Sequence, residues 1–164
     1  AEDLVRKYLG VCLDTCHHAV RWEPSVEALE LYREHEVPVA KVQLSAALEA
    51  DSIRDLAPFA EDRYLHQVVA KDGTTRPDLD PDAPIDGPVR CHFHVPIHRD
   101  EVAGVRTTRD DMLAALRWIL ENGGTDCLEI ETYTWDVLPA ALRTETLLDS
   151  LESEYRSVLA AVPH

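Results

Sequence analysis

The residues best suited to chemistry form the segment Asp14-Thr15-Cys16-His17-His18, which directly follows an apolar run. Asp14 offers a hard oxygen donor, and His17 offers a nitrogen donor three residues later. A carboxylate and an imidazole at this spacing can reach one ion across a turn, so they predict half of a divalent-metal site. A turn aspartate followed by a surface histidine gives the same pattern, and the sequence leaves both interpretations open.

Four short segments with β-strand character must position these groups. They cover residues 9–15, 39–45, 89–95 and 127–133. Helical patterns cover residues 23–35, 108–122 and 144–161, with a weaker one at 46–59. The segment 71–88 is rich in Pro and Asp and predicts an exposed loop. Strands that alternate with helices predict an α/β fold with a parallel sheet.

Each predicted strand has one face with ionisable or hydrogen-bonding side chains, because residues two apart share a face. The third strand places His92 and His94 together, and the fourth places Glu129 and Glu131 together. A half-solvated antiparallel sheet would give the same alternation, with its polar face in water. Because the connections read as helical, we expect helices to cover the apolar face. The polar face would then line an enclosed site at the carboxyl ends of the strands, as in a barrel.

The charge balance excludes several classes of partner. The chain has 164 residues, with 16 Lys+Arg against 31 Asp+Glu, which gives a net charge of −15. Such a surface repels phosphate backbones, so we expect no nucleic-acid partner and no binding to anionic membranes.

We find no run of ~18 apolar residues, no signal-peptide pattern and no C-x-x-C pair. A cytoplasmic protein with reduced, buried cysteines is therefore expected.

Five ordered motifs carry a family resemblance: LGVCLDTCHHAV, VAKVQLSAAL, DRYLHQVV, VRCHFHVPI and LEIETYTWDVLP. They resemble the C-terminal part of the EboE metabolite-traffic proteins, which are xylose isomerase-like TIM barrels of the sugar phosphate isomerase/epimerase type. The resemblance implies an α/β chain of parallel (β/α) units that forms the C-terminal half of a (β/α)8 TIM barrel. A missing N-terminal half, or self-association, would then complete the barrel.

The same resemblance implies a set of metal ligands. The D-T-C-H motif is also similar to that of the endonuclease-four type of AP endonucleases, so Asp14 and His17 match metal ligands. Glu131 matches a ligand of the last strand, and His94 is carried over from the third strand. The implied cofactor is a divalent metal: Mn, Zn, Co or Fe. Gln43 stands where the superfamily often places a histidine.

These features predict a divalent-metal-dependent isomerase or epimerase that acts on a small hydroxylated metabolite. The predicted catalytic residues are Glu131, which transfers a proton, and His94. The predicted substrate contacts are Gln43, His66, His92 and Trp135. For His66 a salt-bridged turn, and for Trp135 packing under the last helix, are equally good interpretations.

A non-catalytic metabolite-binding or traffic protein is the alternative function. A phosphodiester hydrolase of the endonuclease-four kind is disfavoured by the charge. It is also disfavoured by the sequence Asp62-Arg63-Tyr64, which stands in place of the nuclease's Asp-x-His, with His66 displaced by two positions. Nucleotide binding through a glycine-rich loop is unsupported, since neither G-x-G-x-x-G nor a P-loop motif occurs.

Overall fold

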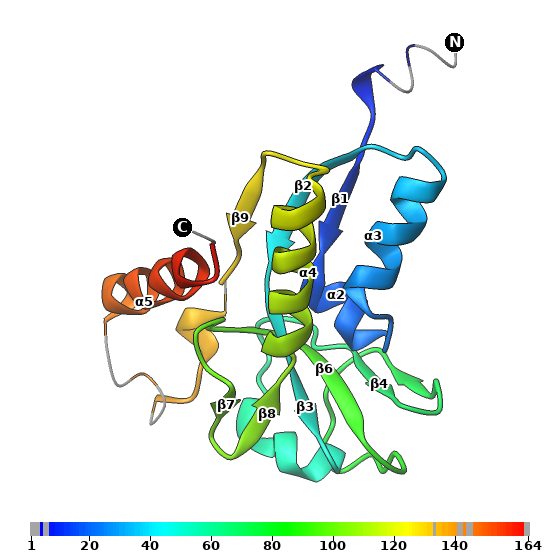
Figure 1. The fold of residues 1–164 in the computed structure, drawn as a ribbon. Helices are drawn as coiled ribbons and strands as arrows, with labels where there is room; N and C mark the ends of the chain where they lie inside the picture. Colours follow the sequence, from blue (N-terminus) through cyan, green and yellow to red (C-terminus); the bar gives the residue numbers. More distant parts are fainter. Residues whose placement is uncertain (1–3, 5–6, 133, 141–142, 144–145, 163–164) are drawn as a thin grey trace.

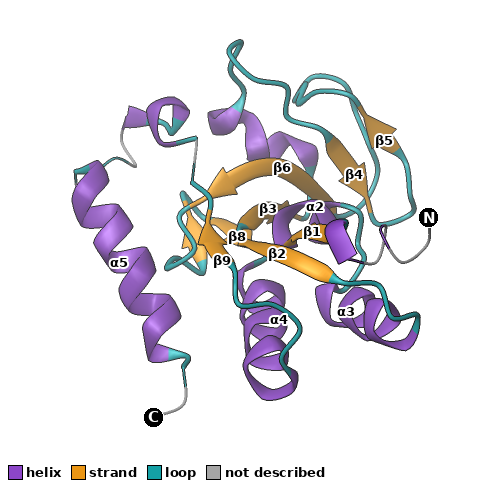
Figure 2. Ribbon diagram, turned by 90° about the horizontal axis from the view of Figure 1, so that it is seen from above, coloured by secondary structure: helices purple, strands orange, loops and turns teal. Residues whose placement is uncertain are grey.

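The computed structural model describes residues 4, 7–132, 134–140, 143 and 146–162 (Figure 1). Three strands form a parallel sheet in the order β1 (Val11–Asp14), β2 (Val39–Leu44) and β9 (Leu128–Ile130). Helices α3 (Ser25–Glu34) and α4 (Arg109–Asn122) lie side by side along one face of this sheet (Figures 1 and 2). Strands β1 and β2 pair in parallel with α3 between them, but β2 is followed in the chain by the strands of a second sheet before α4 and β9.

The apolar face of the parallel sheet packs under the two helices. Leu13, Val42 and Leu44 are buried in one core with Leu29 of α3 and Leu116 of α4. Because strand side chains alternate, the intervening residues occupy the other face, on which the short helix after Asp14 begins. The polar side chains expected there from the sequence are those that build the site described below.

A second, antiparallel sheet lies below the first in Figure 1. Its strand order is β5-β4-β6-β3-β8-β7. The strands are β3 (Ala46–Ala50), β4 (Val68–Ala70), β5 (Thr75–Arg76), β6 (Val89–Val95), β7 (Glu101–Val102) and β8 (Val105–Thr107). The remaining elements are the short helix α2 (Thr15–Val20), the helix α5 (Leu147–Ala160) and two 3-10 helices, η1 (Ile53–Phe59) and η2 (Trp135–Val137).

The predicted half of a TIM barrel is therefore wrong. Strands form within all four predicted ranges, but the third range, β6, lies in the antiparallel sheet and pairs with β3 and β4. The fourth range, β9, pairs with β2 instead of with the third. Residue 133, at the end of the fourth range, and residues 144–145, at the start of the last predicted helix, lie outside the described residues.

The cause of this error lies in residues 46–59, which were expected to form a weak helix. The sequence Ala-Ala-Leu-Glu-Ala at 46–50 favours a helix locally. In the fold it continues from β2 after Ser45 and pairs antiparallel with both β6 and β8. Burial between two neighbouring strands overrides the local helix propensity, and only η1 remains helical.

The segment 71–88 is mostly exposed, as expected, yet it is not structureless. It contains β5, which pairs with β4, and Leu79, which is buried in the main core. The sequence predicted four reduced, buried cysteines. All four are free thiols, but only Cys16 and Cys91 are buried, whereas Cys12 and Cys127 are exposed. No helix among the described residues is long and apolar enough to cross a membrane.

Candidate metal centre

The site begins where β1 becomes α2. Asp14 is the last residue of β1 and the N-cap of α2, and its Oδ1 accepts a hydrogen bond of 3.1 Å from the backbone N–H of His17. An aspartate is a favoured N-cap because its carboxylate satisfies one of the unpaired N–H groups of the first turn. This cap places His17 above Asp14, with 3.9 Å between His17 Nε2 and Asp14 Oδ2.

A buried hydroxyl network fixes the Asp14 carboxylate. Ser45 Oγ donates to Asp14 Oδ1 at 2.7 Å and accepts from the backbone N–H of Cys16 at 2.9 Å. Thr15 Oγ1 in turn donates to the backbone carbonyl of Ser45 at 2.6 Å. This role of Ser45 was not predicted from the sequence. Its position at the junction of β2 and β3 brings it under α2.

Strand β6 brings two more imidazoles to the same place. His92 and His94 are two residues apart and share the face that meets α2. The Nε2 atoms of His17 and His92 are 2.9 Å apart, and those of His92 and His94 are 3.1 Å apart. We call His17, His92 and His94 the histidine cluster.

The contacts within the histidine cluster cannot all be hydrogen bonds. A neutral imidazole Nε2 carries either one proton or one lone pair, so His92 Nε2 can satisfy only one of its two neighbours. His94 Nδ1 lies 3.4 Å from the backbone carbonyl of Glu131, which favours a proton on Nδ1 and a lone pair on Nε2. Nε2 atoms this close together suit a shared cation, which would accept a lone pair from each ring.

The electrostatics keep these rings ready to bind a cation. Burial and, to a smaller extent, the neighbouring His94 and His17 lower the pKa of His92 to about 4. Burial also lowers the pKa of His94, against the opposing charge of Asp14. Both rings are therefore neutral near pH 7, and the neutral imidazole is the form that binds metal ions.

The Asp14 carboxylate is held in its charged form. Burial acts to raise its pKa, but the Ser45 hydroxyl and the nearby His94 and His17 outweigh this effect, and the pKa of Asp14 is lowered. An oxygen of Asp14, His17 Nε2 or Nδ1 and a ring nitrogen of His94 all lie within 4.8 Å of one another. Donor atoms that coordinate one ion at ~2.0–2.2 Å must lie about this close together.

A second set of three donors overlaps the first. Cys16, His92 and His94 also place one donor atom each within 4.8 Å of one another. Burial raises the pKa of the Cys16 thiol well above its usual value, and the charge of Asp14 adds to this effect. A protonated thiol is a poor ligand, so the set with Asp14 and His17 is the better one for a divalent ion at neutral pH.

Glu131 follows directly after β9 and lies beside this cluster. Its backbone N–H donates to the carbonyl of Leu44 at 3.3 Å, and its Oε2 is 3.9 Å from His94 Nδ1. The side-chain amide of Gln43 donates to the same Oε2. Burial and the adjacent charge of Asp14 raise the pKa of Glu131 to about 7. The carboxyl group can therefore take up and release a proton near neutral pH.

The structure brings together most of the residues singled out in the sequence. Asp14, His17, His92, His94, Glu131 and Gln43 form one contiguous group. His66 is separate from it: the side chain is fully buried, with Nε2 2.7 Å from Glu61 Oε1 and Nδ1 2.9 Å from the backbone carbonyl of His92. Trp135 is half-buried and packs against the main core.

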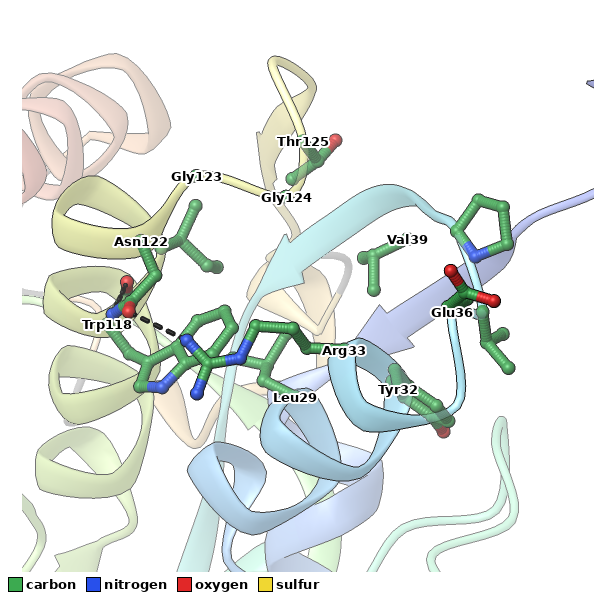
Figure 3. Close-up of a pocket in the computed structure, with 13 residues that line it drawn as sticks. Leu29, Tyr32, Arg33, Glu36, Val39, Trp118, Asn122, Gly123, Gly124 and Thr125 are labelled. Carbon is green, nitrogen blue, oxygen red and sulfur yellow. Dashed lines mark hydrogen bonds between the residues drawn. The ribbon is translucent and has the colours of Figure 1, made fainter.

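Two small cavities differ in their relation to this cluster. One, of about 290 Å³, is lined by His17 and His92 together with Val20, Arg21 and Gln67. The other, of about 300 Å³, lies between α3 and α4 near the first residue of β2, Val39 (Figure 3). There the Arg33 guanidinium lies 5.0 Å from the centroid of the Trp118 ring and donates to Asn122. None of the residues that line this second cavity belongs to the histidine cluster.

Comparison of the chain with models of protein families, with curated proteins and with solved structures finds no match. The resemblance to the EboE proteins therefore stays a prediction from the sequence motifs. The geometry of the histidine cluster, Asp14 and Glu131 is the basis for a functional assignment.

Proposed function

We propose that this protein is a divalent-metal-dependent enzyme of the isomerase or epimerase type that moves a proton on a small hydroxylated metabolite. The observation that carries the proposal is that donor atoms of Asp14, His17 and His94 lie within 4.8 Å of one another, with His92 Nε2 2.9 Å from His17 Nε2 and 3.1 Å from His94 Nε2. Asp14, His17 and His94 would hold the ion, with His92 as a further ligand. The barrel that first suggested this activity is not part of the proposal.

The donor set fits a borderline transition metal. Three imidazole nitrogens with one carboxylate oxygen suit Zn²⁺, Mn²⁺, Co²⁺ or Fe²⁺, whereas Ca²⁺ and Mg²⁺ prefer sites made of oxygen atoms. The hydrogen bond from Ser45 to Asp14 Oδ1 leaves Oδ2 directed at His17, which is the arrangement expected of a supported ligand. A bound ion of this kind polarises a carbonyl or hydroxyl group of a substrate.

Glu131 is the proposed proton-transfer group. A general base is most effective when its pKa is near the working pH, and a pKa of about 7 meets this condition. Its Oε2 is held by the Gln43 amide and faces His94, so the group that takes up the proton is next to the proposed ligands. Glu129, two residues earlier on the same face, pairs instead with Lys41 and is more exposed.

Solvent exchange tests this activity without knowledge of the natural substrate. Metal-loaded protein is incubated in deuterated water with a panel of small hydroxyketones, and deuterium at the carbon next to the carbonyl is followed by mass spectrometry. The wild-type chain should exchange at least one of them, and Glu131→Gln should lose at least ~100-fold of the rate. Glu129→Gln is the matched control and should retain the rate. Equal rates in both variants would contradict the role of Glu131.

A binding or traffic protein without turnover is the second candidate. The observation in its favour is the hydrogen bond from Gln43 to Glu131, because an amide donor stabilises the charged carboxylate and restrains the base. This candidate predicts metal binding and ligand binding with no deuterium exchange. The Gln43→Ala variant separates the two functions. Loss of the hydrogen bond to Glu131 should change the deuterium-exchange rate of an enzyme, whereas a non-catalytic protein should show no exchange with or without it.

A further inference from the structure

We propose that the cavity beside the histidine cluster binds the anionic group, a carboxylate or a phosphate, of the small molecule on which the metal centre acts. This inference rests on the proposed function, because it names the class of that molecule. His17 and His92 line the cavity and also contribute to the cluster. A molecule in the cavity therefore lies against two of the proposed metal ligands.

The size of the cavity limits the ligand to a small molecule. Its volume of about 290 Å³ is at the lower end of the ~300–1,000 Å³ that small-molecule sites span. Val20 supplies the one aliphatic side chain of the lining, and the other four residues carry polar groups. The surface of the lining is mostly apolar, so the cavity suits a compact metabolite with a polar group at one end.

Arg21 supplies the positive charge of the cavity. It follows α2 as the C-cap residue, and its side chain is 63% exposed. Its Nε donates to Glu23 Oε1 at 3.3 Å, and both side chains of this ion pair are exposed. Exposed pairs of this kind are weak, so an incoming anion can replace Glu23 at little cost. The planar guanidinium offers paired N–H donors that match the oxygens of a carboxylate or a phosphate.

Gln67 adds a neutral donor beside His92. Its backbone carbonyl accepts a 2.8 Å hydrogen bond from the N–H of His92, so Gln67, just before β4, is a direct neighbour of His92 in β6. None of the five lining residues is acidic, in a chain whose net charge is −15. The acidic members of the site, Asp14 and Glu131, are outside the lining. An anionic group should therefore lie toward Arg21, which leaves the rest of the molecule near the metal ligands.

The test uses the full chain without metal, so that the probe anion cannot bind an ion directly. Inorganic phosphate and acetate are titrated separately, and the ring signals of His17 and His92 are followed by NMR. Saturable shifts are expected for at least one anion, and Arg21→Gln should weaken that binding about tenfold. Arg63→Gln is the matched control, because Arg63 is similarly exposed and similarly paired with a carboxylate, yet lies outside the cavity. The affinity of Arg63→Gln for the anion should equal that of the wild type.

The outcomes separate this inference from the proposed function. Arg21-dependent binding of phosphate alone, or of acetate alone, supports the inference and identifies the class of anion. The absence of saturable shifts, or equal affinities in Arg21→Gln and the wild type, overturns it. A zinc titration of Arg21→Gln should match that of the wild type. Failure of both proteins to bind zinc would contradict the metal centre, while the anion titration would still decide the cavity.

Discussion

The Nε2 atoms of His17 and His92 lie 2.9 Å apart, although 75 residues separate the two histidines in the chain. One comes from the first turn of α2 and the other from β6, in the antiparallel sheet. Because His92 Nε2 also lies 3.1 Å from His94 Nε2, one nitrogen faces two others. An arrangement that is unfavourable for three neutral rings alone is favourable once they share a cation.

Replacement of a proposed ligand should remove metal binding. His94→Gln takes away the nitrogen whose tautomer is fixed by the carbonyl of Glu131, and zinc affinity should fall at least ~100-fold. Isothermal titration calorimetry measures this directly. His18→Gln is the control, since His18 adjoins His17 in sequence but faces Glu23 outside the cluster. A similar loss in both variants would show that the binding is not specific to the cluster.

Loss of the Ser45 hydroxyl should weaken both the fold and the metal site. Ser45→Ala leaves Asp14 Oδ1 without its buried donor and the N–H of Cys16 without its acceptor. The free energy of unfolding should fall by about 1–3 kcal/mol, and metal affinity by about 10–100-fold. Chemical denaturation without metal gives the first value, and calorimetry gives the second. Ser153→Ala, in the exposed face of α5, should change neither value. Unchanged zinc affinity in Ser45→Ala would contradict a supporting role.

The pH dependence of stability should report the protonation of Glu131. Its folded-state pKa of about 7 is above the ordinary 4.5, so the folded chain keeps a proton that the unfolded chain releases. The resulting stability is fully present below pH 4.5 and is lost as the pH rises through 7. Relative to Glu131→Gln, the metal-free wild type should therefore lose on the order of 1–2 kcal/mol over this range, a value reduced by solvent screening.

His92 acts in the opposite direction, which is why the difference between two proteins must be measured. Its pKa is lowered from 6.5 to about 4, so its contribution is present above pH 6.5 and is lost as the pH falls through 4. This contribution is common to the wild type and Glu131→Gln and cancels in their difference. Urea denaturation at several pH values provides the curves. A difference that grows as the pH falls would have the wrong sign for a raised Glu131 pKa.

The pair formed by buried His66 and partly buried Glu61 should support the strand that carries the cluster. Both ring nitrogens of His66 face oxygen atoms, Glu61 Oε1 at 2.7 Å and the carbonyl of His92 at 2.9 Å. Glu61→Gln should lower the free energy of unfolding by about 1–3 kcal/mol, because a charge-assisted bond to a fully buried ring is lost. Glu152→Gln, in an exposed pair with Arg156, should cost no more than about 0.5 kcal/mol. If Glu61→Gln lowered the free energy of unfolding as little as Glu152→Gln does, the stabilising role of the pair of His66 and Glu61 would be contradicted.

Local patterns explain why much of the site could be predicted from the sequence. Asp14 and His17 stand at the spacing of an N-cap and its third helical residue, so their proximity follows from one turn of helix. The alternation of side chains in a strand places His92 and His94 on one face wherever that strand pairs. The same alternation places Gln43 and Glu131 on the open face of the parallel sheet.

Non-local pairing explains what could not be predicted. The residues Ala46–Ala50 have a helix-forming composition, and only their burial between β6 and β8 makes them a strand. That pairing moves β6 out of the parallel sheet and turns a predicted barrel into two sheets. It also places Ser45 under α2 and encloses His66, neither of which has a signal within a short window of sequence.

The most direct test of the metal centre is the metal content of the purified chain. Protein produced with added zinc, manganese, cobalt and iron is passed through a desalting column, and bound metal is measured by elemental analysis alongside a variant that combines Asp14→Asn with His94→Gln. The metal centre described above predicts one transition-metal ion per wild-type chain and none in the variant. A wild-type chain with no metal above the level of the buffer, or a variant with as much metal as the wild type, would contradict it.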